Sequence, residues 1–375
     1  MYLSRLNLSN FKNYSEIDLE FSPRINCFVG DNGVGKTNIL DAIHYLSLTK
    51  SYFANIDSVN IRHGNDYFII KGLFNNGDSG EEIMCGLQKG KRKVFRRAGK
   101  EYTRISDHIG RYPVVMISPA DSSIITDGSE ERRKFMNNVI SQFDQDYLND
   151  IINYNKALKQ RNKLLKDYAS QGKFDREMLE LWESQMLKPC ETIYNSRTHF
   201  VKEIIPLFQQ YYDHISEKRE EVRLKYRSQL SNNSLKELFE KNIDKDRILR
   251  YTTAGIHRDD LNLEMDGYQI KDIGSQGQQK SYLVAIKLAK FEYIRNKGGI
   301  KPILLMDDVF DKFDEKRVAQ IIALVSENRF GQIFITDTHR DRMQSVLSQL
   351  NIEYKLFMID DGIKEIVNNG EQSKQ

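Results

Sequence analysis

The eight residues from Gly30 to Thr37, Gly-Asp-Asn-Gly-Val-Gly-Lys-Thr, constrain the fold of this chain more than any other segment. They fit the P-loop pattern G-x-x-x-x-G-K-[ST], which binds phosphate where it connects a buried strand to a helix. That context is present, because 25–29 is a short apolar run and the apolar residues of 39–46 have helical spacing. The sequence therefore predicts a strand, a phosphate-binding loop and a helix in succession.

The residue types of this loop suit a nucleotide. Glycines let backbone N–H groups turn toward phosphate oxygens, and the following helix presents its positive end to the same anion. Lys36 is expected to reach the β- and γ-phosphates of ATP, and Thr37 to place its hydroxyl on Mg²⁺. The alternative is a chance glycine-rich turn. The predicted nucleotide-binding residues are Gly30, Asp31, Asn32, Gly33, Val34, Gly35, Lys36, Thr37 and Asn38.

A second buried-type strand, 303–306, ends in two acids, Asp307 and Asp308. A P-loop ATPase needs a carboxylate at the end of a neighbouring strand to hold Mg²⁺. We expect Asp307 to serve the metal and Asp308 to polarise the attacking water, so that Asp308 and Lys36 are the predicted catalytic residues. An acidic turn with solvated carboxylates is the alternative, and the P-loop makes the metal site the preferred interpretation.

The texture of the chain changes twice along its 375 residues. Residues 1–125 and 251–375 read as α/β, with a β-meander at about 67–104, whereas 126–250 is rich in Lys, Glu, Gln and Leu and reads as helical. Helix breaks are expected near Gly172, Pro189 and Asn232. The simplest architecture is one α/β domain made by both chain ends, with a helical domain inserted between them.

The segment Gly274-Ser275-Gln276-Gly277-Gln278 precedes a predicted helix and lies upstream of the acidic strand. Ser275 and Gln278 fit a capping box, so an ordinary helix start is one explanation. The segment also resembles the signature motif of ABC-type ATPases. That resemblance implies that Ser275, Gln276, Gly277 and Gln278 contact the γ-phosphate of ATP held by a second copy. It also places the D-loop at 311–314.

The chain as a whole resembles the RecF family, DNA replication and repair ATPases related to the heads of SMC and Rad50 proteins. The matching stretches are 35–38, 118–121, 131–135, 154 with 156–162, 255–260, 275–280 and 304–309. The family usually has Pro where Ile256 stands and Ser where Asp311 stands. The resemblance implies an ABC-type ATPase head that dimerises on ATP, binds single-stranded, gapped or double-stranded DNA, and works with RecR and RecO. Because Asp307 and Asp308 are intact, we expect the chain to hydrolyse ATP, and to do so slowly.

Two basic segments are candidate DNA surfaces, although the formal net charge is only +3. One, at 89–104, carries eight cations and a single acid on the predicted meander: Lys89, Lys91, Arg92, Lys93, Arg96, Arg97, Lys100 and Arg104. The other lies on a predicted helix and contains Lys156, Lys159, Arg161, Lys163 and Lys166. Contacts to phosphates from either would be salt-sensitive and would not read base sequence. A solvated charged face is the alternative for both.

Other features of the sequence narrow the cellular compartment and the type of P-loop protein. Three distant cysteines allow no disulfide framework, and the sequence has no signal segment or long apolar run, so we expect a cytoplasmic protein with no membrane contact. His257 beside Asp259 and Asp260 is more typical of hydrogen-bonded structure than of a metal site. A transporter ATPase subunit would need a switch histidine after 333–335, where Thr336 and Asp337 stand. An SMC or Rad50 head would need a long coiled coil, and a small-molecule kinase would leave 275–278 unexplained.

Overall fold

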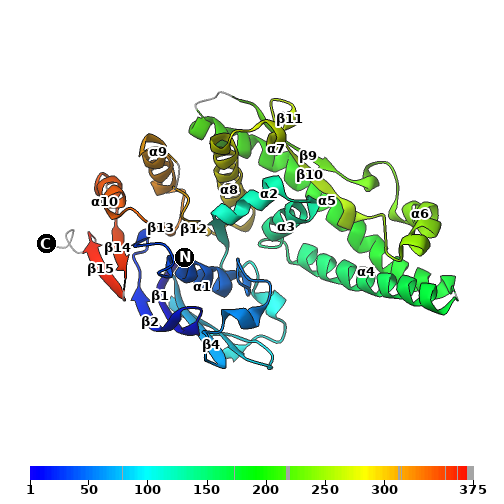
Figure 1. Ribbon diagram of the computed structural model, residues 1–375, viewed down its shortest axis with the longest axis horizontal. Coiled ribbons are helices and arrows are strands. Elements are labelled where there is room, and N and C mark those ends of the chain that lie inside the picture. Colours follow the sequence, from blue (N-terminus) through cyan, green and yellow to red (C-terminus); the bar gives the residue numbers. More distant parts are fainter. Residues whose placement is uncertain are drawn as a thin grey trace. The chain divides into compact units, whose positions relative to one another are not determined.

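The computed structural model describes residues 1–77, 79–172, 174–216, 220–310, 313, 315–350, 352–360 and 362–369. The chain divides into two compact units. Unit 1 contains Met1–Asp121 and Leu283–Gln375, and unit 2 contains Ser122–Tyr282. Unit 1 therefore takes both ends of the chain, as Figure 1 shows by the blue and red ends of the colour scale.

Unit 1 contains two six-stranded sheets. In the first, the order β2-β1-β4-β5-β6-β7 is antiparallel throughout. Its strands are β1 (Tyr2–Phe11), β2 (Tyr14–Glu20), β4 (Tyr67–Asn76), β5 (Ser79–Gln88), β6 (Val94–Arg97) and β7 (Lys100–Glu101). Buried and exposed side chains alternate along β4, as expected for a sheet with one covered face. The predicted meander at 67–104 is confirmed.

The second sheet has the order β15-β14-β3-β13-β12-β8 and is parallel except for its edge strand β15. Its strands are β3 (Ile25–Val29), β8 (Val114–Ile117), β12 (Ile303–Asp307), β13 (Ile333–Asp337), β14 (Tyr354–Ile359) and β15 (Ile363–Asn368). Every residue of β3, β8, β12 and β13 is buried, which is why these strands read as continuous apolar runs. The neighbours β3, β13 and β12 bring three strand ends to one edge.

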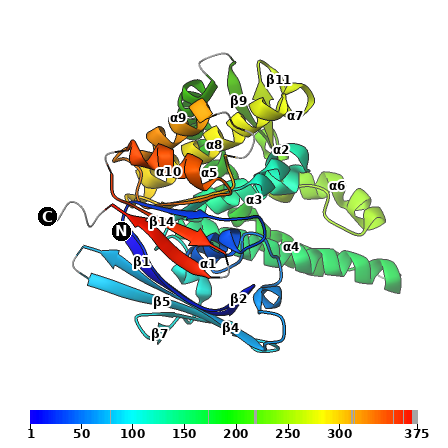
Figure 2. The same cartoon turned by 60° about the vertical axis from the view of Figure 1, so that its left-hand side comes forward.

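Helix α1 (Lys36–Leu48) is buried along nearly its whole length between the two sheets of unit 1. Its apolar residues join one core cluster with side chains from both sheets, including Leu6, Phe68, Leu305 and Phe334. Helices α9 (Glu315–Ser326) and α10 (Arg340–Ser348) lie on the other side of the parallel sheet, as Figure 2 shows. The P-loop helix is thus fixed by packing on two faces.

Unit 2 is mainly helical: α2 (Ser123–Thr126), α3 (Ser129–Ile140), α4 (Gln145–Gln171), α5 (Arg176–Ser216), α6 (Leu235–Leu249), α7 (Ile270–Ile273) and the start of α8 (Gln276–Gly298). The long helices α4 and α5 lie side by side as a hairpin, with α6 against them (Figure 1). A three-stranded antiparallel sheet joins β9 (Val222–Arg227), β10 (Asp260–Met265) and β11 (Tyr268–Gln269).

Two local predictions for unit 2 were wrong. The break expected near Pro189 does not occur, because α5 continues through Pro189 and Pro206. A proline inside a helix costs roughly 3 kcal/mol, and the buried side chains that line α5 on both sides of Pro189 offset it. Strand β9 interrupts what was predicted as helix, since alternating Val222, Leu224 and Tyr226 pair with β10.

The limits of unit 2 also differ from the predicted insert of 126–250. The unit extends to Tyr282, because β10 pairs with β9 and residues 252–259 bond to helices of the same unit. The texture after Thr252 was correctly read as α/β in character, but its strands complete a sheet that begins in the helical segment. Strand pairing between distant segments is not visible in local composition.

Candidate nucleotide-binding site

The backbone of the P-loop fits against its surroundings only with glycine at two positions. A Cβ on Gly30 would lie 2.2 Å from the carbonyl oxygen of Ile359. Gly35 has φ 113°, and a Cβ there would lie 2.4 Å from Asn13 Nδ2. The loop therefore leaves β3 and enters α1 through a path that other residues would obstruct. The predicted order of strand, loop and helix is confirmed.

The side chain of Lys36 folds back and bonds to the backbone of the P-loop. Its Nζ donates to the carbonyl oxygens of Gly30 at 2.6 Å and Asp31 at 2.7 Å, and the residue is only 6% exposed. Burial lowers the pKa of the Lys36 ammonium, and the nearby carboxylates of Asp308 and Asp307 oppose that shift. An ammonium whose bonds go to neutral carbonyls can turn to an anion at little cost, as a phosphate-binding lysine must.

Asp307 is the last residue of β12, and its carboxylate bonds to the P-loop helix α1 and to the neighbouring strand β13. Thr37 Oγ1 donates to Asp307 Oδ1 at 2.7 Å, and Thr336 Oγ1 donates to the same oxygen at 2.9 Å. Burial raises the pKa of this carboxyl group, while the two hydroxyl hydrogen bonds oppose the shift. The predicted metal residues Thr37 and Asp307 are thus in direct contact, an oxygen pair of the kind Mg²⁺ prefers.

Asp308 follows on a strained backbone. Its φ is +47°, in the left-handed region, and its N–H donates to Thr336 Oγ1 at 2.9 Å. The residue is half-buried, whereas Asp307 is 4% exposed. Aspartate tolerates this conformation better than most residues, and such backbone strain clusters at functional sites. Thr336 therefore holds the carboxylate of Asp307 and the backbone of Asp308 at the predicted catalytic edge.

The carboxylate of Asp337, at the end of β13, bonds to residues at the start of α10. It accepts from the His339 backbone N–H at 2.7 Å and pairs with Arg342 at 2.7 Å. His339 is the residue before α10 and lies two residues beyond Asp337. The switch position is thus occupied by Thr336, which bonds to the acids, and by an aspartate that closes the start of α10.

Sequence reasoning missed two residues beside the P-loop. Asn13 and Tyr14 lie where β1 turns into β2, and Asn13 Nδ2 donates to the Val34 carbonyl oxygen at 3.0 Å. Asn38 Nδ2 donates to Asn13 Oδ1 at 2.7 Å. The turn between the two strand patterns was readable, but its approach to Gly35 depends on how the two sheets stack, which local sequence does not encode.

The predicted signature segment lies in unit 2 at the start of α8. Ser275 Oγ accepts from the Gln278 N–H at 3.3 Å, and Gln278 Oε1 accepts from the Ser275 N–H at 2.8 Å. This is the capping box that the sequence offered as one explanation. Ser275, Gln276 and Gly277 are exposed, and Gln278 Nε2 also donates to Glu220 at 2.9 Å. Of the predicted D-loop, Asp311, Lys312 and Asp314 lie outside the described residues.

His257 is a structural residue. Its Nδ1 bonds to the Tyr154 hydroxyl at 2.8 Å, and its Nε2 bonds to the Thr252 carbonyl at 3.0 Å. Burial lowers the pKa of His257 to about 4. In the described parts of the chain, no three His, Cys, Asp or Glu side chains gather to hold a metal ion. The departure at Ile256 is buried, and its carbonyl accepts from Arg197 at 2.9 Å.

The two basic segments differ once they are folded. On the meander, Lys93 Nζ bonds to the Thr49 carbonyl at 2.6 Å and to Asp57 at 2.8 Å, and Arg97 pairs with Glu81 at 2.8 Å. On α4, Arg161 is fully buried and bonds to Glu183, Asp246 and Thr252. Its predicted place on a DNA surface was wrong. The cations that remain exposed are Lys89, Lys91, Arg92, Arg96, Lys100 and Arg104 on the meander and Lys156, Lys159, Lys163 and Lys166 on α4.

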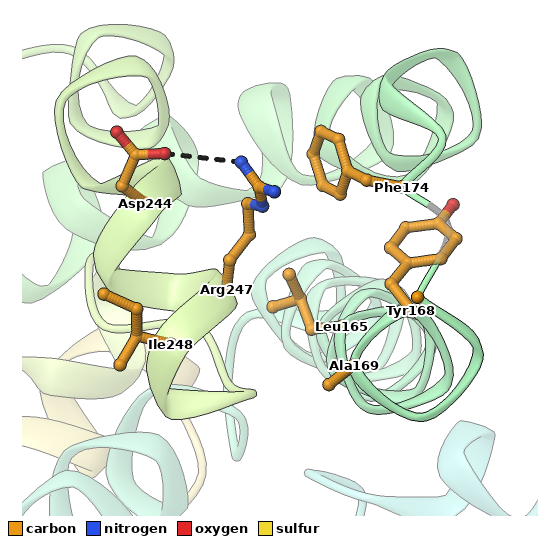
Figure 3. A pocket seen from close by; sticks show the side chains of 8 residues that line it. Leu165, Tyr168, Ala169, Phe174, Asp244, Arg247 and Ile248 are labelled. Carbon is orange, nitrogen blue, oxygen red and sulfur yellow. Dashed lines mark hydrogen bonds and ion pairs between the residues drawn. The ribbon is translucent and has the colours of Figure 1, made fainter.

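A hollow of about 580 Å³ in unit 2 is lined by α4, by Phe174 of the segment that follows it, and by α6 (Figure 3). Leu165, Tyr168 and Ile248 supply its apolar wall. Arg247 pairs with Asp244 at 3.5 Å and stands 4.4 Å from the centre of the Phe174 ring. None of the residues predicted to bind a nucleotide lines it, and its charged side chain is already engaged with its neighbours.

Comparison with known proteins places this architecture. A family model described as an AAA domain matches residues 5–252. DNA replication and repair protein RecF from Phocaeicola vulgatus is 48% identical over 365 residues, which cover 96% of this chain and 97% of that protein. The chain belongs to the RecF family. RecF from Flavobacterium johnsoniae is 48% identical over 357 residues, covering 95% of this chain and 99% of its own length.

Solved structures agree with this assignment. A structure of "the recombination mediator protein RecF-ATPrS in RecFOR pathway" matches with a TM-score of 0.87 at 28% identity, covering 98% of both chains. An Smc head bound to the C-winged helix domain of ScpA has a TM-score of 0.60 at 18% identity, with full coverage of both chains, and shares the fold. The predicted α/β class and the ABC-type, SMC-like ATPase head are confirmed. No helix in the described residues is long and apolar enough to cross a membrane.

Proposed function

We propose that this chain is a cytoplasmic RecF-type ATPase that binds ATP with Mg²⁺ and acts on DNA during repair and replication. The observation that carries the proposal is the meeting of the P-loop with the acidic strand end, through the 2.7 Å bond from Thr37 to Asp307. Relatives at 48% identity are named for DNA replication and repair, and a structural neighbour is named RecF-ATP in the RecFOR pathway. A transporter or SMC-type role shares only the fold.

The residues present fit ATP and Mg²⁺. Glycine at positions 30 and 35 would let the loop backbone approach an anion closely, and Lys36 Nζ lies beside the loop, bonded to the carbonyl oxygens of Gly30 and Asp31. Thr37 and Asp307 would hold Mg²⁺, directly and through water. Bound Mg²⁺ neutralises phosphate charge during transfer. Asp308, whose backbone N–H is held by Thr336, would accept a proton from the attacking water.

The ATP site is incomplete within one copy in this proposal. The segment of Ser275, Gln276, Gly277 and Gln278 at the start of α8, whose first three residues are exposed, would contact the γ-phosphate of ATP bound to a second copy. ATP would then join two copies, and hydrolysis, slow and stimulated by DNA, would release them. Binding energy from nucleotide thereby becomes dimer interface energy. RecO and RecR are the proposed protein partners, because the neighbouring structure belongs to the RecFOR pathway.

The test of this proposal separates binding, turnover and assembly. Lys36→Ala should abolish ATP binding measured by calorimetry, and Asp308→Asn should bind ATP but lose turnover. Light scattering should give a dimer mass for Asp308→Asn with ATP and Mg²⁺ and a monomer mass without nucleotide. Ser275→Arg should bind ATP and stay monomeric. A wild type and an Asp308→Asn variant that both stay monomeric with ATP would refute the paired site.

A further inference from the structure

We infer that the outward face of α4 is a docking surface for the phosphate backbone of double-stranded DNA. This inference rests on the proposed function and gives its DNA partner a place. The lysine face comprises Lys156, Lys159, Lys163 and Lys166. All four are exposed, and their spacing of three, four and three residues places them within about 80° of one another around a helix of 3.6 residues per turn.

The buried residues of α4 lie on the opposite side of the helix from the four lysines. Tyr154, Ala157, Arg161 and Leu165 are each no more than 2% exposed, and they lie on the side opposite the lysines. Arg161, the cation in the middle of the run, is therefore withdrawn from the surface. Of the five cations in this part of α4, the four lysines are the ones that reach the surface.

The four lysines have no acidic partners in the part of the chain that the structure describes. Exposed arginines elsewhere in unit 2 do pair, as Arg223 does with Glu221 and Arg247 does with Asp244. Like charges at spacings of three and four residues destabilise a helix. A helix face that keeps four such charges unpaired is suited to an external polyanion that neutralises them.

The dimensions and chemistry of the lysine face favour duplex DNA. At 1.5 Å per residue, Lys156 and Lys166 lie about 15 Å apart along the axis, roughly the span of four phosphates of one strand. The other exposed residues of this face, Ile152, Asn155 and Ser170, include no aromatic ring. Single-stranded DNA is held mainly by bases that stack on aromatic side chains, and a duplex needs only backbone contacts.

The experiment compares two variants with equal loss of charge in unit 2. The first carries glutamine at Lys156, Lys159, Lys163 and Lys166, and the matched control carries glutamine at the exposed Lys188, Lys202, Lys236 and Lys245. Binding of a 30-base-pair duplex and of a single strand of equal length is measured with ATP across a salt series, and ATP binding and dimer mass are measured in parallel.

The lysine-face variant should bind the duplex at least about tenfold more weakly, with a salt slope reduced by roughly three to four. The control should lose less than about threefold, and both should bind ATP and dimerise like the wild type. Equal losses in the two variants, or a larger loss for the single strand, would overturn the inference. A wild type that dimerises with ATP but does not bind DNA would instead count against the DNA part of the proposed function.

Tyr14, at the start of β2, lies beside the P-loop. This side chain is 8% exposed, and its hydroxyl has no hydrogen-bond partner among the described residues. The hydroxyl lies against the P-loop, because a Cβ on Gly35 would be 2.7 Å from it. Buried polar groups almost always have partners. We infer that the Tyr14 hydroxyl donates to a phosphate oxygen of the bound nucleotide and acts as a positioning residue.

Tyr14→Phe removes only this hydroxyl, so it separates the ligand role from a structural one. The variant should unfold at the same or a higher temperature than the wild type without nucleotide, because a buried unsatisfied group is removed. It should bind ATP roughly tenfold more weakly, and ATP should raise its unfolding temperature less. Tyr112→Phe is the control, since the Tyr112 hydroxyl already donates to Glu81. Unchanged ATP affinity in Tyr14→Phe would refute the inference.

Discussion

The two faces of α4 both bear cations, but the cation of the inward face is buried and those of the outward face are exposed. On the inward face, Arg161 is fully buried, with its guanidinium bonded to Glu183 at 2.8 Å and to Asp246 at 2.7 Å. On the outward face, Lys159 and Lys163 stand exposed on either side of it. The difference shows that helix phase decides what a cation does. The inward charge holds unit 2 together, and the outward charges are available to a partner.

Removing the inward charge should have the largest effect on stability. Arg161→Ala leaves Asp246 buried without a cation and leaves Glu183 with Arg176 as its remaining partner, which should cost about 3–5 kcal/mol of the free energy of unfolding. Urea denaturation of the full chain measures it. Lys163→Ala is the control on the outward face and should cost less than about 0.5 kcal/mol. A small loss in Arg161→Ala would mean that the buried pairs contribute little.

Buried and exposed histidines offer the same comparison through pH. Burial lowers the pKa of His108 to about 4, and its Nε2 bonds to the Leu46 carbonyl oxygen at 2.7 Å. Because the folded pKa lies below the unfolded value of about 6.5, this contribution is complete above pH 6.5 and is lost as the pH falls toward 4. The resulting loss in the free energy of unfolding should reach about 1–2 kcal/mol at pH 5.

The check is the free energy of unfolding between pH 7 and 5. His108→Gln should flatten this acid-induced loss by the share that His108 contributes. The exposed His199, which contacts Glu203 at 3.1 Å, is the solvent-facing comparison, and His199→Gln is measured in parallel. Equal curves for wild type and His108→Gln would contradict the assignment of the acid sensitivity to this buried ring.

The meander repeats the contrast between inward and outward cations on a smaller scale. Lys93 contacts Asp57, the Thr49 carbonyl and the Tyr45 hydroxyl, whereas Lys91 is exposed. Lys93→Ala should cost about 1–2 kcal/mol of the free energy of unfolding, because it leaves half-buried acceptors unpaired. Lys91→Ala should change it by less than about 0.5 kcal/mol. Similar losses in a denaturant series would break the comparison.

The smallest expected effect has the opposite sign. Replacing the four lysines of the lysine face by glutamine removes three like-charge neighbour pairs on α4, and each such pair destabilises a helix by about 0.2–0.5 kcal/mol. The variant should therefore be slightly more stable in low salt, and the gain should fade as salt rises. Differential scanning calorimetry in low and high salt measures it. A destabilised variant would show that these side chains serve unit 2 itself.

The same contrast explains what the sequence could predict. The P-loop, the acidic strand and the buried strands were predictable, because each feature is local and its residue types are dictated by phosphate chemistry or by burial on two faces. Arg161 could not be separated from its lysine neighbours by counting charge, since its partners come from α5 and α6. Its phase with Tyr154 and Leu165 was the available signal. Tyr14 and β9 depended on contacts between distant segments.

Mixing two inactive variants tests the paired ATP site most directly. Lys36→Ala lacks a working P-loop, and Ser275→Arg blocks the segment that a second copy would offer. In a mixed dimer, the P-loop of the Ser275→Arg chain meets the intact segment of the Lys36→Ala chain, so one site is restored. The account predicts that ATPase activity, absent in each variant alone, returns in part when the two are mixed. No activity in a mixture of folded variants would contradict it.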